Sequence, residues 1–362
     1  MNVKYGQPSY LPLKNLDPSK YYRQLAEASY ALGMLQTAHS KISNAEHLIK
    51  PLLTREASLS SKIEGTITDS KDVFILDATG KAPQQDTIVV ANYRDAMRLA
   101  MKIKDQKGGI SKYQIRQLHY VLLHRTPHNG ALGKFRSKDV WIGKNKSTSI
   151  QKATYVPPFY TAVEGYMDNL VDYFNSTDET PLIKTAIFHY QFEAIHPFED
   201  GNGRIGRMLI PALLQYQGAL SAPVLYTSEY FEKKAKEYRQ MLHYVDTTGD
   251  ITPWIIFFLE SLKEQCGISI SLVEKITKLN EILLDRYEGS QSPNMNRMVN
   301  MIFETPVFQI SHVIKTLKIS RITASSLVNR LLEDRVIDSI RSVRGTKGAT
   351  VYYFPKLLTL IS

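Results

Sequence analysis

The chain has 362 residues, of which 43% are hydrophobic, and its formal net charge is +10 at pH 7. This length favours more than one domain, and the hydrophobic content is sufficient for buried cores. No run of residues suits a membrane span, the first six residues do not form a signal peptide, and the single cysteine, Cys266, excludes an internal disulfide. We therefore expect a cytoplasmic protein without a membrane partner.

The first third of the chain predicts helices after an irregular start. Prolines at positions 8, 12 and 18 exclude a helix over residues 1–17. Apolar residues at helical spacing then predict helices over residues 18–35, from about residue 45, over 86–104 and over 111–123, the last with Ser111 as its N-cap.

Within this region, residues 54–65 read as a helix that ends at Gly65, which suits the position after a helix terminus. Ser60 and Glu64 are four positions apart and share one face of that helix. A glutamate in the last turn opposes the helix dipole, so we expect a group outside this helix to compensate the charge of Glu64.

A β-hairpin is predicted in the middle of the chain. Residues 139–143 and 153–156 are short runs of β-forming residues, separated by a polar loop over 144–152 and closed by two prolines. The candidate contact residues in these two runs are Trp141, Ile142, Tyr155 and Val156.

Residues 196–207 stand out because this run of twelve holds one histidine, two acidic residues, three glycines and two arginines. It lies between two stretches with helical spacing, 182–195 and 205–220, which predicts a helix-loop-helix turn. Backbone N–H groups at Gly201, Asn202 and Gly203, with the positive end of the helix dipole, favour an anion site for phosphates.

Four side chains of the same run can act on a phosphate compound. Arg204 and Arg207 project from one face of the second helix and can each contact two phosphate oxygens. Asp200 can hold Mg²⁺, which prefers one or two carboxylates plus phosphate oxygens. His196 can take a proton from a hydroxyl group at neutral pH and is the candidate general base.

The C-terminal region follows a polar linker over residues 289–293. Helices are predicted over 297–303, 310–317 and 320–336, the last with Ile322 and Leu327 facing inward, and strands over 337–340 and 351–354 around a basic loop. This order resembles a winged helix-turn-helix domain. The candidate contacts to DNA are Arg321, Asn329, Arg330, Arg341, Arg344 and Lys347. A module for packing, dimerisation or target docking is the alternative.

The run over residues 196–207 resembles the signature of the Fic family, His-x-Phe-x-Asp/Glu-Gly-Asn-Gly-Arg-x-x-Arg, and matches it at every fixed position. The resemblance implies a fold that is mainly α, a Fic-type helical bundle with a β-hairpin flap, here with a small C-terminal winged-helix domain. It also implies transfer of AMP from ATP to a Ser, Thr or Tyr hydroxyl of a target protein or of the enzyme itself, with loss of pyrophosphate.

The resemblance also implies roles for individual residues. His196 would be the catalytic base, Phe198 the buried anchor of the loop and Asp200 the Mg²⁺ ligand. The loop would hold the phosphates through Gly201, Asn202, Gly203, Arg204 and Arg207, with Asn202 on the α-phosphate. Tyr238 and Asp246, on the helix after the signature, would border the nucleotide base.

Two further segments fit the same family. Ser60, Glu64 and Gly65 match its inhibitory motif, Ser/Thr-x-x-x-Glu-Gly/Asn, so that Glu64 would pair with Arg207 and keep it from the γ-phosphate. The segment 133–136 with the hairpin would be the flap, against which the target lies as an added strand.

These inferences divide the chain into three parts. Residues 1–110 would be an N-terminal helical region with the inhibitory helix at about 54–65. Residues 111–288 would be the catalytic core with the flap at about 136–158, and 289–362 the winged-helix domain. The leading hypothesis is a self-inhibited protein adenylyltransferase, with a second copy of the chain as a candidate partner in a homodimer. The alternatives are removal of AMP by use of Glu64, and a DNA-binding regulator whose core senses nucleotide.

Overall fold

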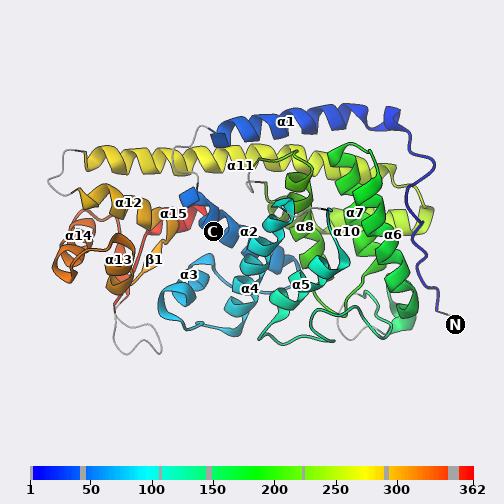
Figure 1. Ribbon diagram of the computed structural model, residues 1–362, viewed down its shortest axis with the longest axis horizontal. Helices are drawn as coiled ribbons and strands as arrows, with labels where there is room; N and C mark the ends of the chain where they lie inside the picture. The colour runs from blue at the N-terminus through cyan, green and yellow to red at the C-terminus, as the bar shows by residue number, and fades with distance from the viewer. Residues whose placement is uncertain are drawn as a thin grey trace. The chain divides into compact units, whose positions relative to one another are not determined.

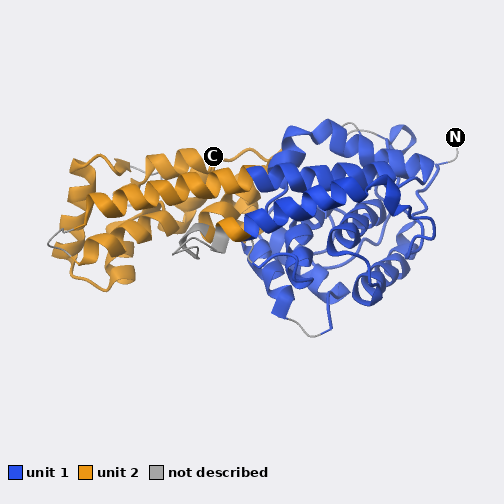
Figure 2. Ribbon diagram, turned by 90° about the horizontal axis from the view of Figure 1, so that it is seen from above, with its two compact units in different colours: residues 1–36, 95–267 blue, residues 37–94, 268–362 orange. Residues whose placement is uncertain are grey.

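The computed structural model describes residues 3–40, 46–105, 108–143, 149–221, 225–288, 293–340 and 350–362, and the statements below concern these residues. They are mainly α-helical (Figure 1), as the sequence predicts. None of the described helices is both long enough and apolar enough to cross a membrane. The chain forms two compact units, residues 1–36 with 95–267 and residues 37–94 with 268–362 (Figure 2). The three-part division drawn from the sequence stays a prediction.

Three helices contribute residues to both units, namely α1 (Tyr22–Ser40), α4 (Gln85–Ala100) and α11 (Thr252–Arg286). The first unit also contains α5 (Lys112–Leu123), α6 (Val163–Ser176), α7 (Pro181–Ile195), α8 (Asn202–Tyr216), α9 (Ser228–Lys233) and α10 (Ala235–Thr248). Short 3₁₀ turns lie at Pro18–Lys20, Met101–Asp105, Ile150–Lys152 and Tyr160–Ala162. The sequence analysis did not identify α6.

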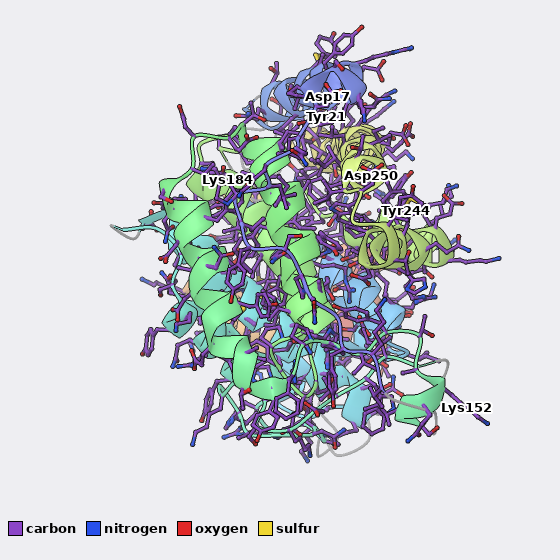
Figure 3. All side chains as sticks on the ribbon, turned by 90° about the vertical axis from the view of Figure 1, so that its right-hand side faces the viewer. Asp17, Tyr21, Lys152, Lys184, Tyr244 and Asp250 are labelled. Atoms are coloured by element: carbon purple, nitrogen blue, oxygen red, sulfur yellow. The ribbon has the colours of Figure 1, made fainter. Side chains whose placement is uncertain are left out.

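Helix α7 is the centre of the first unit. Nearly all its side chains are buried, and it packs against α6, α8 and α10. The buried Lys184 of α7 (Figure 3) donates hydrogen bonds to the carbonyl groups of Phe174 and Thr177, at the end of α6. This lysine donates to carbonyl groups that have no partner within α6. Its positive charge also interacts favourably with the negative end of the dipole of that helix.

Helix α5 starts as the sequence predicts. The Ser111 hydroxyl accepts a hydrogen bond from the N–H of Gln114, and the Gln114 side chain accepts one from the N–H of Ser111, which is a capping box. This cap defines the start of α5, which packs against α8 and α6.

The predicted hairpin is reduced to one antiparallel bridge among the described residues. Ile142 pairs with Tyr155, and its N–H donates to the Tyr155 carbonyl at 2.8 Å. Residues 150–152, expected in the polar loop, form a 3₁₀ turn instead of continuing a ladder. Residues 144–148 of that loop lie outside the described part of the chain.

The second unit contains α2 (Glu46–Ile63), α3 (Ser70–Thr79), α12 (Asn294–Glu304), α13 (Ile310–Leu317), α14 (Arg321–Glu333) and α15 (Pro355–Leu360). The sequence analysis missed α3, although Asp69 caps its start and Gly80 ends it in the left-handed conformation. It also missed α15. Helix α2 packs against α12 and α3.

A three-stranded antiparallel sheet completes the second unit. Its strands β1 (Val307–Phe308), β2 (Asp338–Ile340) and β3 (Val351–Tyr353) lie in the order β1-β3-β2. The sequence analysis predicted β2 and β3 and missed β1, which is only two residues long. The predicted basic contacts Arg341, Arg344 and Lys347 lie outside the described residues.

The expected orientation of Ile322 is wrong. Helix α14 buries Ala324, Leu327, Val328 and Leu331, and Ile322 is 83% exposed. These four buried positions follow the period of one helix face, and Ile322 lies two positions before the first of them, on another face. The N-cap of α14 is Ser320, which the sequence analysis placed as the first residue of the helix, and its hydroxyl accepts a hydrogen bond from the N–H of Thr323.

Candidate active site

His196 ends α7 in a left-handed backbone conformation, with φ 49° and ψ 61°. A residue with a side chain rarely adopts this conformation and persists there only when its surroundings hold it. The half-buried imidazole has its Nδ1 atom 3.3 Å from the Glu193 carbonyl oxygen. A proton on Nδ1 donates to that carbonyl, which leaves the lone pair on Nε2. This is the tautomer that a general base requires.

Arg136 holds the backbone on both sides of this histidine. Its Nε donates to the His196 carbonyl at 2.9 Å, and its backbone N–H donates to the Pro197 carbonyl at 2.9 Å. Its two terminal nitrogens donate to the carbonyl groups of Lys138, Pro158 and Ile195. Burial lowers the pKa of Arg136, which stays charged because the guanidinium group is so basic. One buried cation therefore binds the loop that follows α7 and both ends of the segment 138–158.

His119 of α5 supports the same loop from another side. Its ring stacks on that of Phe198 with centroids 3.9 Å apart, and Phe198 is fully buried, as expected for the anchor of the loop. Its Nδ1 accepts from the Gly133 N–H at 3.0 Å, and its Nε2 donates to the Asp200 carbonyl at 3.2 Å. Burial lowers the pKa of His119 to about 4, so the ring is neutral near pH 7.

The side chain of Asn202 is hydrogen-bonded within the loop. Its Oδ1 accepts from the Phe198 N–H at 2.8 Å, and its Nδ2 donates to the Phe198 carbonyl at 2.9 Å. Asn202 is 1% exposed, so both polar groups are used to close the loop. In this structure the Asn202 side chain thus binds the loop backbone, and its contact with a phosphate stays a prediction.

The start of α8 has the features of an anion site. Gly201 precedes the helix with φ 83°, and no side chain caps the N–H groups of the first turn. Arg204 and Arg207 are both buried, at 7% and 1% exposed. The Nε of Arg204 is buried and has no hydrogen-bond partner among the described residues. An unsatisfied buried donor beside a helix N-terminus favours a bound anion.

Asp200 lies beside these arginines. Its Oδ1 is 3.1 Å from Nη2 of Arg204, and its side chain is 37% exposed. Among the described residues no group of three or more His, Cys, Asp or Glu side chains could hold a metal ion. Asp200 suits a Mg²⁺ ion only if phosphate oxygens supply further ligands, and its role as a ligand stays a prediction.

The two residues predicted to border the nucleotide base lie on α10. Tyr238 is 3% exposed, its hydroxyl is 2.8 Å from Nε2 of His189, and its ring stacks on that of Phe231. These are contacts of a core residue. Asp246 accepts a hydrogen bond from the Tyr190 hydroxyl at 2.9 Å, and burial raises its pKa to about 6. Asp246 lines a cavity of about 90 Å³ together with Tyr155 and Tyr190.

The flap residues differ in exposure. Trp141 and Ile142 are 43% and 37% exposed, whereas Val156 is buried. The Tyr155 hydroxyl donates to the Ala194 carbonyl at 2.8 Å, two positions before His196. Burial raises the pKa of Tyr155. The flap has two arms, residues 139–143 and residues 153–156. The second arm is thus hydrogen-bonded to the end of α7, and the first arm exposes apolar side chains.

The predicted inhibitory residues lie in the second unit at the end of α2. Ser60 is buried, Glu64 is exposed, and Gly65 has φ 87°. The Thr66 N–H donates to the Ser61 carbonyl at 3.1 Å, across the left-handed Gly65, which is the hydrogen bond of a Schellman motif. This confirms that a helix ends at Gly65 as the sequence predicts.

The sequence analysis gave no individual role in the site to three residues that shape it, although it included Arg136 in the flap segment. His119 and Arg136 act through contacts 81 and 60 positions apart, which no local pattern signals. Gly206 is the third: a Cβ atom there would come 2.3 Å from Oε1 of Glu193 and 3.2 Å from the His189 ring, so a side chain at this position would displace the Glu193 carboxylate. The sequence did offer one signal for Gly206, because a glycine inside a helix, between the two arginines of the run, often marks a position with little room for a side chain.

The loop, the arginine pair and the helical core define the class of protein, and comparison with known proteins agrees. The profile of the Fic/DOC family matches residues 109–214, and that of the Fic/DOC family N-terminal region matches residues 22–102. Together the two matches cover more than half of the chain, and the chain belongs to the Fic/DOC family.

Curated relatives carry the name of an enzyme. The chain is 30% identical over 299 residues to Protein adenylyltransferase Fic of Drosophila willistoni, which covers 78% of this chain and 56% of that protein. It is 27% identical over 171 residues to Protein adenylyltransferase fic-1 of Caenorhabditis briggsae, which covers 46% and 27%. The chain thus spans about half, or less, of the length of these relatives.

Solved structures share the fold. A Fic family protein from Desulfovibrio desulfuricans G20 matches with a TM-score of 0.62 at 22% identity, over 95% of this chain and 98% of that chain. A Fic domain containing signaling protein from Bacteroides thetaiotaomicron matches with a TM-score of 0.54 at 20% identity, over 69% and 97%.

Proposed function

We propose that this protein is an adenylyltransferase that moves AMP from ATP to a hydroxyl group of a protein side chain and releases pyrophosphate. The observation that carries the proposal is the arrangement at the α7–α8 loop. A histidine whose Nδ1 lies within hydrogen-bond distance of the Glu193 carbonyl ends α7, and the glycine-led start of α8 follows it with two buried arginines. The names of the curated relatives support the same reaction.

The phosphates of ATP bind at the start of α8. The N–H groups of Asn202, Gly203 and Arg204 have no intrahelical partners, and the dipole of α8 favours negative charge there. The buried Nε of Arg204 gains the acceptor that it lacks. Arg207 neutralises further phosphate charge inside the protein, where electrostatic interactions are stronger than in water.

Asp200 is the residue that would hold Mg²⁺ next to these phosphates. Its partly exposed carboxylate fits an ion that takes one protein carboxylate and several phosphate and water oxygens. The ion would supply neutralisation of the phosphate charge that develops during transfer.

His196 removes the proton of the attacking hydroxyl. The hydroxyl oxygen forms a bond to the α-phosphorus, the bond from that phosphorus to the bridging oxygen of pyrophosphate breaks, and the proton passes to Nε2 of His196. Arg136 and His119 keep the loop in place while this occurs. The attacking residue is presented at the flap, where Trp141 and Ile142 offer apolar contacts and a target strand can pair with the backbone.

The proposal is tested with ATP labelled at either the α- or the γ-phosphate. We expect the α label, and not the γ label, to be retained on protein. His196→Ala should lower the rate by at least about 10²- to 10⁴-fold, the usual contribution of general base catalysis, with ATP binding preserved. Retention of the γ label alone, or full activity of His196→Ala, would reject the mechanism.

We also propose that the enzyme is self-inhibited through Glu64. The support is local: α2 ends at Gly65, which leaves the exposed carboxylate of Glu64 beside the negative end of the helix dipole. An arginine partner would stabilise a negative charge in such a place. The match of Ser60, Glu64 and Gly65 to the inhibitory motif implies that Arg207 is this partner. Pairing would withdraw Arg207 from ATP and misplace the α-phosphorus.

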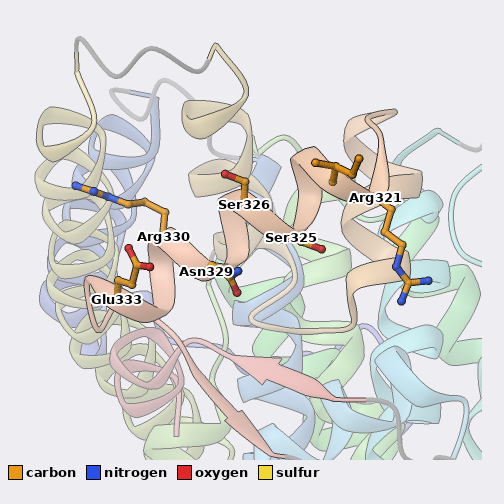
Figure 4. Close-up of a pocket in the computed structure, with 7 residues that line it drawn as sticks. Arg321, Ser325, Ser326, Asn329, Arg330 and Glu333 are labelled. Atoms are coloured by element: carbon orange, nitrogen blue, oxygen red, sulfur yellow. The ribbon is translucent and has the colours of Figure 1, made fainter.

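A second candidate function concerns the C-terminal region, which we propose is a winged helix-turn-helix domain that contacts duplex DNA. The outer face of α14 supports it, with Ser325, Ser326 and Asn329 between Arg321 and Arg330 (Figure 4). Small polar side chains with arginines suit the major groove. However, the Nε of Arg330 donates to Oδ2 of Asp334 at 3.0 Å, so we assign the main phosphate contact to Arg321.

A further inference from the structure

The segment before α1 lies against the flap and the helices that carry the candidate active site. Its residues 3–13 have no regular secondary structure, yet hydrogen bonds at four of them bind residues far along the chain. In Figure 1 the segment runs from the N-terminus past α6 to α1. We call residues 5–11 the strap.

The strap contacts both arms of the flap. The Tyr5 hydroxyl donates to Oδ2 of Asp139 at 2.8 Å, on the first arm. The Gly6 N–H donates to the Val156 carbonyl at 2.6 Å, on the second arm. Because Tyr155 pairs with Ile142 on the other side, the second arm is hydrogen-bonded to protein backbone on both of its edges.

The other end of the strap is anchored on the helices. The Ser9 carbonyl accepts from the Gln191 side chain of α7 at 2.8 Å. The Asn169 side chain of α6 accepts from the Leu11 N–H at 2.8 Å and donates to its carbonyl at 2.9 Å. Leu11 is 6% exposed. The strap is therefore a fixed part of the first unit, which ties the flap to α6 and α7.

Gly6 is the point of closest approach. A Cβ atom at this position would come 2.4 Å from the Tyr155 hydroxyl oxygen and 2.8 Å from two ring atoms. The ring has little freedom to withdraw, because its hydroxyl donates to the Ala194 carbonyl at 2.8 Å and the residue is half-buried. Any side chain at position 6 must therefore displace either the strap or Tyr155.

We propose that the strap is a positioning element of the transfer reaction, and that Gly6 is its positioning residue. The inference rests on the proposed adenylyltransferase activity. By holding Val156 and confining Tyr155, the strap sets the second arm of the flap relative to the end of α7, two residues before His196. Since a target strand is presented by the flap, the strap decides where the attacking hydroxyl lies.

The test compares Gly6→Ala and Asn169→Ala with Gly165→Ala, whose Cβ would meet nothing within 4 Å. Amide hydrogen exchange is measured on peptides that cover residues 139–143 and 153–158, with self-modification from α-labelled ATP and ATP affinity measured in parallel. We expect faster exchange in these peptides for Gly6→Ala and, more weakly, for Asn169→Ala. We expect self-modification to fall about 10- to 100-fold for Gly6→Ala, since small misplacements of reacting groups cost that much, at unchanged ATP affinity.

The results separate the strap from the proposed function. Wild-type exchange in the flap peptides of Gly6→Ala would overturn the proposal, and so would faster exchange with undiminished self-modification. If the wild-type protein retains no α label, the adenylyltransferase proposal fails and the strap loses its catalytic role, while the exchange data still show whether it holds the flap. Asn169→Ala keeps the test valid if Gly6→Ala does not fold, because it releases the strap at a site away from the flap.

Discussion

The left-handed conformation of His196 is held by side chains from other parts of the chain. Arg136 binds its carbonyl, and His119 binds the carbonyl of Asp200 four positions later. A strained backbone of this kind costs of the order of 1–3 kcal/mol and persists only where the surroundings determine it. The position of the candidate base therefore depends on residues that do not touch the reactants.

This dependence predicts the effect of Arg136→Lys. A lysine keeps the charge but cannot donate in the several directions that the guanidinium group uses. We expect kcat for self-modification to fall about 10- to 100-fold, as for other small misplacements of reacting groups, with little change in KM for ATP. Arg98→Lys, at an exposed pair with Asp95, is the matched control and should retain full activity. Equal rates in both variants would remove Arg136 from the support of His196.

His119 predicts a pH dependence of stability. Burial lowers its pKa from 6.5 to about 4, so between these values the unfolded state binds more protons than the folded state. The stability that the neutral ring supplies is complete above pH 6.5 and is lost as the pH falls towards 4. The full shift corresponds to about 3 kcal/mol at most, at 1.36 kcal/mol per pKa unit.

The measurement is urea unfolding of wild type and His119→Phe between pH 4.5 and 7.5. The variant keeps an aromatic ring that can stack on Phe198, but that ring cannot bind a proton. The difference in the free energy of unfolding between the two proteins should therefore shrink as the pH falls. His243→Gln, at an exposed histidine, is the matched control and should parallel wild type. A difference in the free energy of unfolding that stays constant over this pH range would contradict the conclusion that His119 is neutral in the folded protein.

At the scale of the element, helix ends determine how the proposed inhibition works. Gly65 ends α2 in the left-handed conformation and leaves Glu64 at the last turn, whereas Gly201 precedes the uncapped first turn of α8. One helix end thus carries a negative group at its negative end, and the other carries buried arginines at its positive end. The glutamate and the arginines are each placed unfavourably with respect to the dipole of their own helix, and a contact between them would stabilise both.

We therefore predict that Glu64→Gly raises self-modification strongly, by at least about tenfold if a single charge-assisted pair of about 1.5–3 kcal/mol is lost. The increase should disappear in the double variant Glu64→Gly/His196→Ala, because release of the phosphate site cannot help without a base. Labelling of the three proteins side by side with α-labelled ATP measures this. A Glu64→Gly variant no more active than wild type would reject self-inhibition and favour a role for Glu64 in removing AMP.

At the scale of the whole molecule, the candidate active site and the α14 face belong to different compact units. The residues from 292 onward include ten Lys or Arg and four Asp or Glu, so this region carries much of the positive charge. A basic module of this kind binds nucleic acid mainly through phosphates, with strong salt dependence. The two proposed activities can therefore be tested independently.

Binding of a labelled DNA duplex at several salt concentrations makes this test. We expect Arg321→Ala to weaken binding and to reduce the salt slope by about one, as the loss of one phosphate contact does. Arg330→Ala should have a smaller effect on that slope, because Asp334 already pairs with its guanidinium group. Salt-insensitive binding, or none by the intact protein, would favour a docking role for α14 instead.

Much of the fold and of the candidate site was predictable from the sequence alone, because the signals are local. The boundaries of α5, α7 and α13 follow from helical spacing and end signals, and the residues of the 196–207 run are neighbours along the chain. Elements with weak local signals were missed, among them α3, α15 and the two-residue β1, whose formation depends on packing. The orientation of Ile322 was misjudged because an isolated isoleucine carries no information about which helix face is buried.

The sequence by itself determined the chemistry: a histidine, an aspartate and two arginines around a glycine-rich helix start, with an acidic helix end upstream. Helix periodicity and the unsatisfied N–H groups of a helix start are properties of short segments, so they are legible without a structure. Only the tertiary structure decided how that chemistry is held. Arg136, His119 and the strap act over 60, 81 and as many as 182 positions, and the Asn202 side chain is hydrogen-bonded to the loop backbone. Such contacts depend on which buried polar groups meet after folding, where each must find a hydrogen-bond partner.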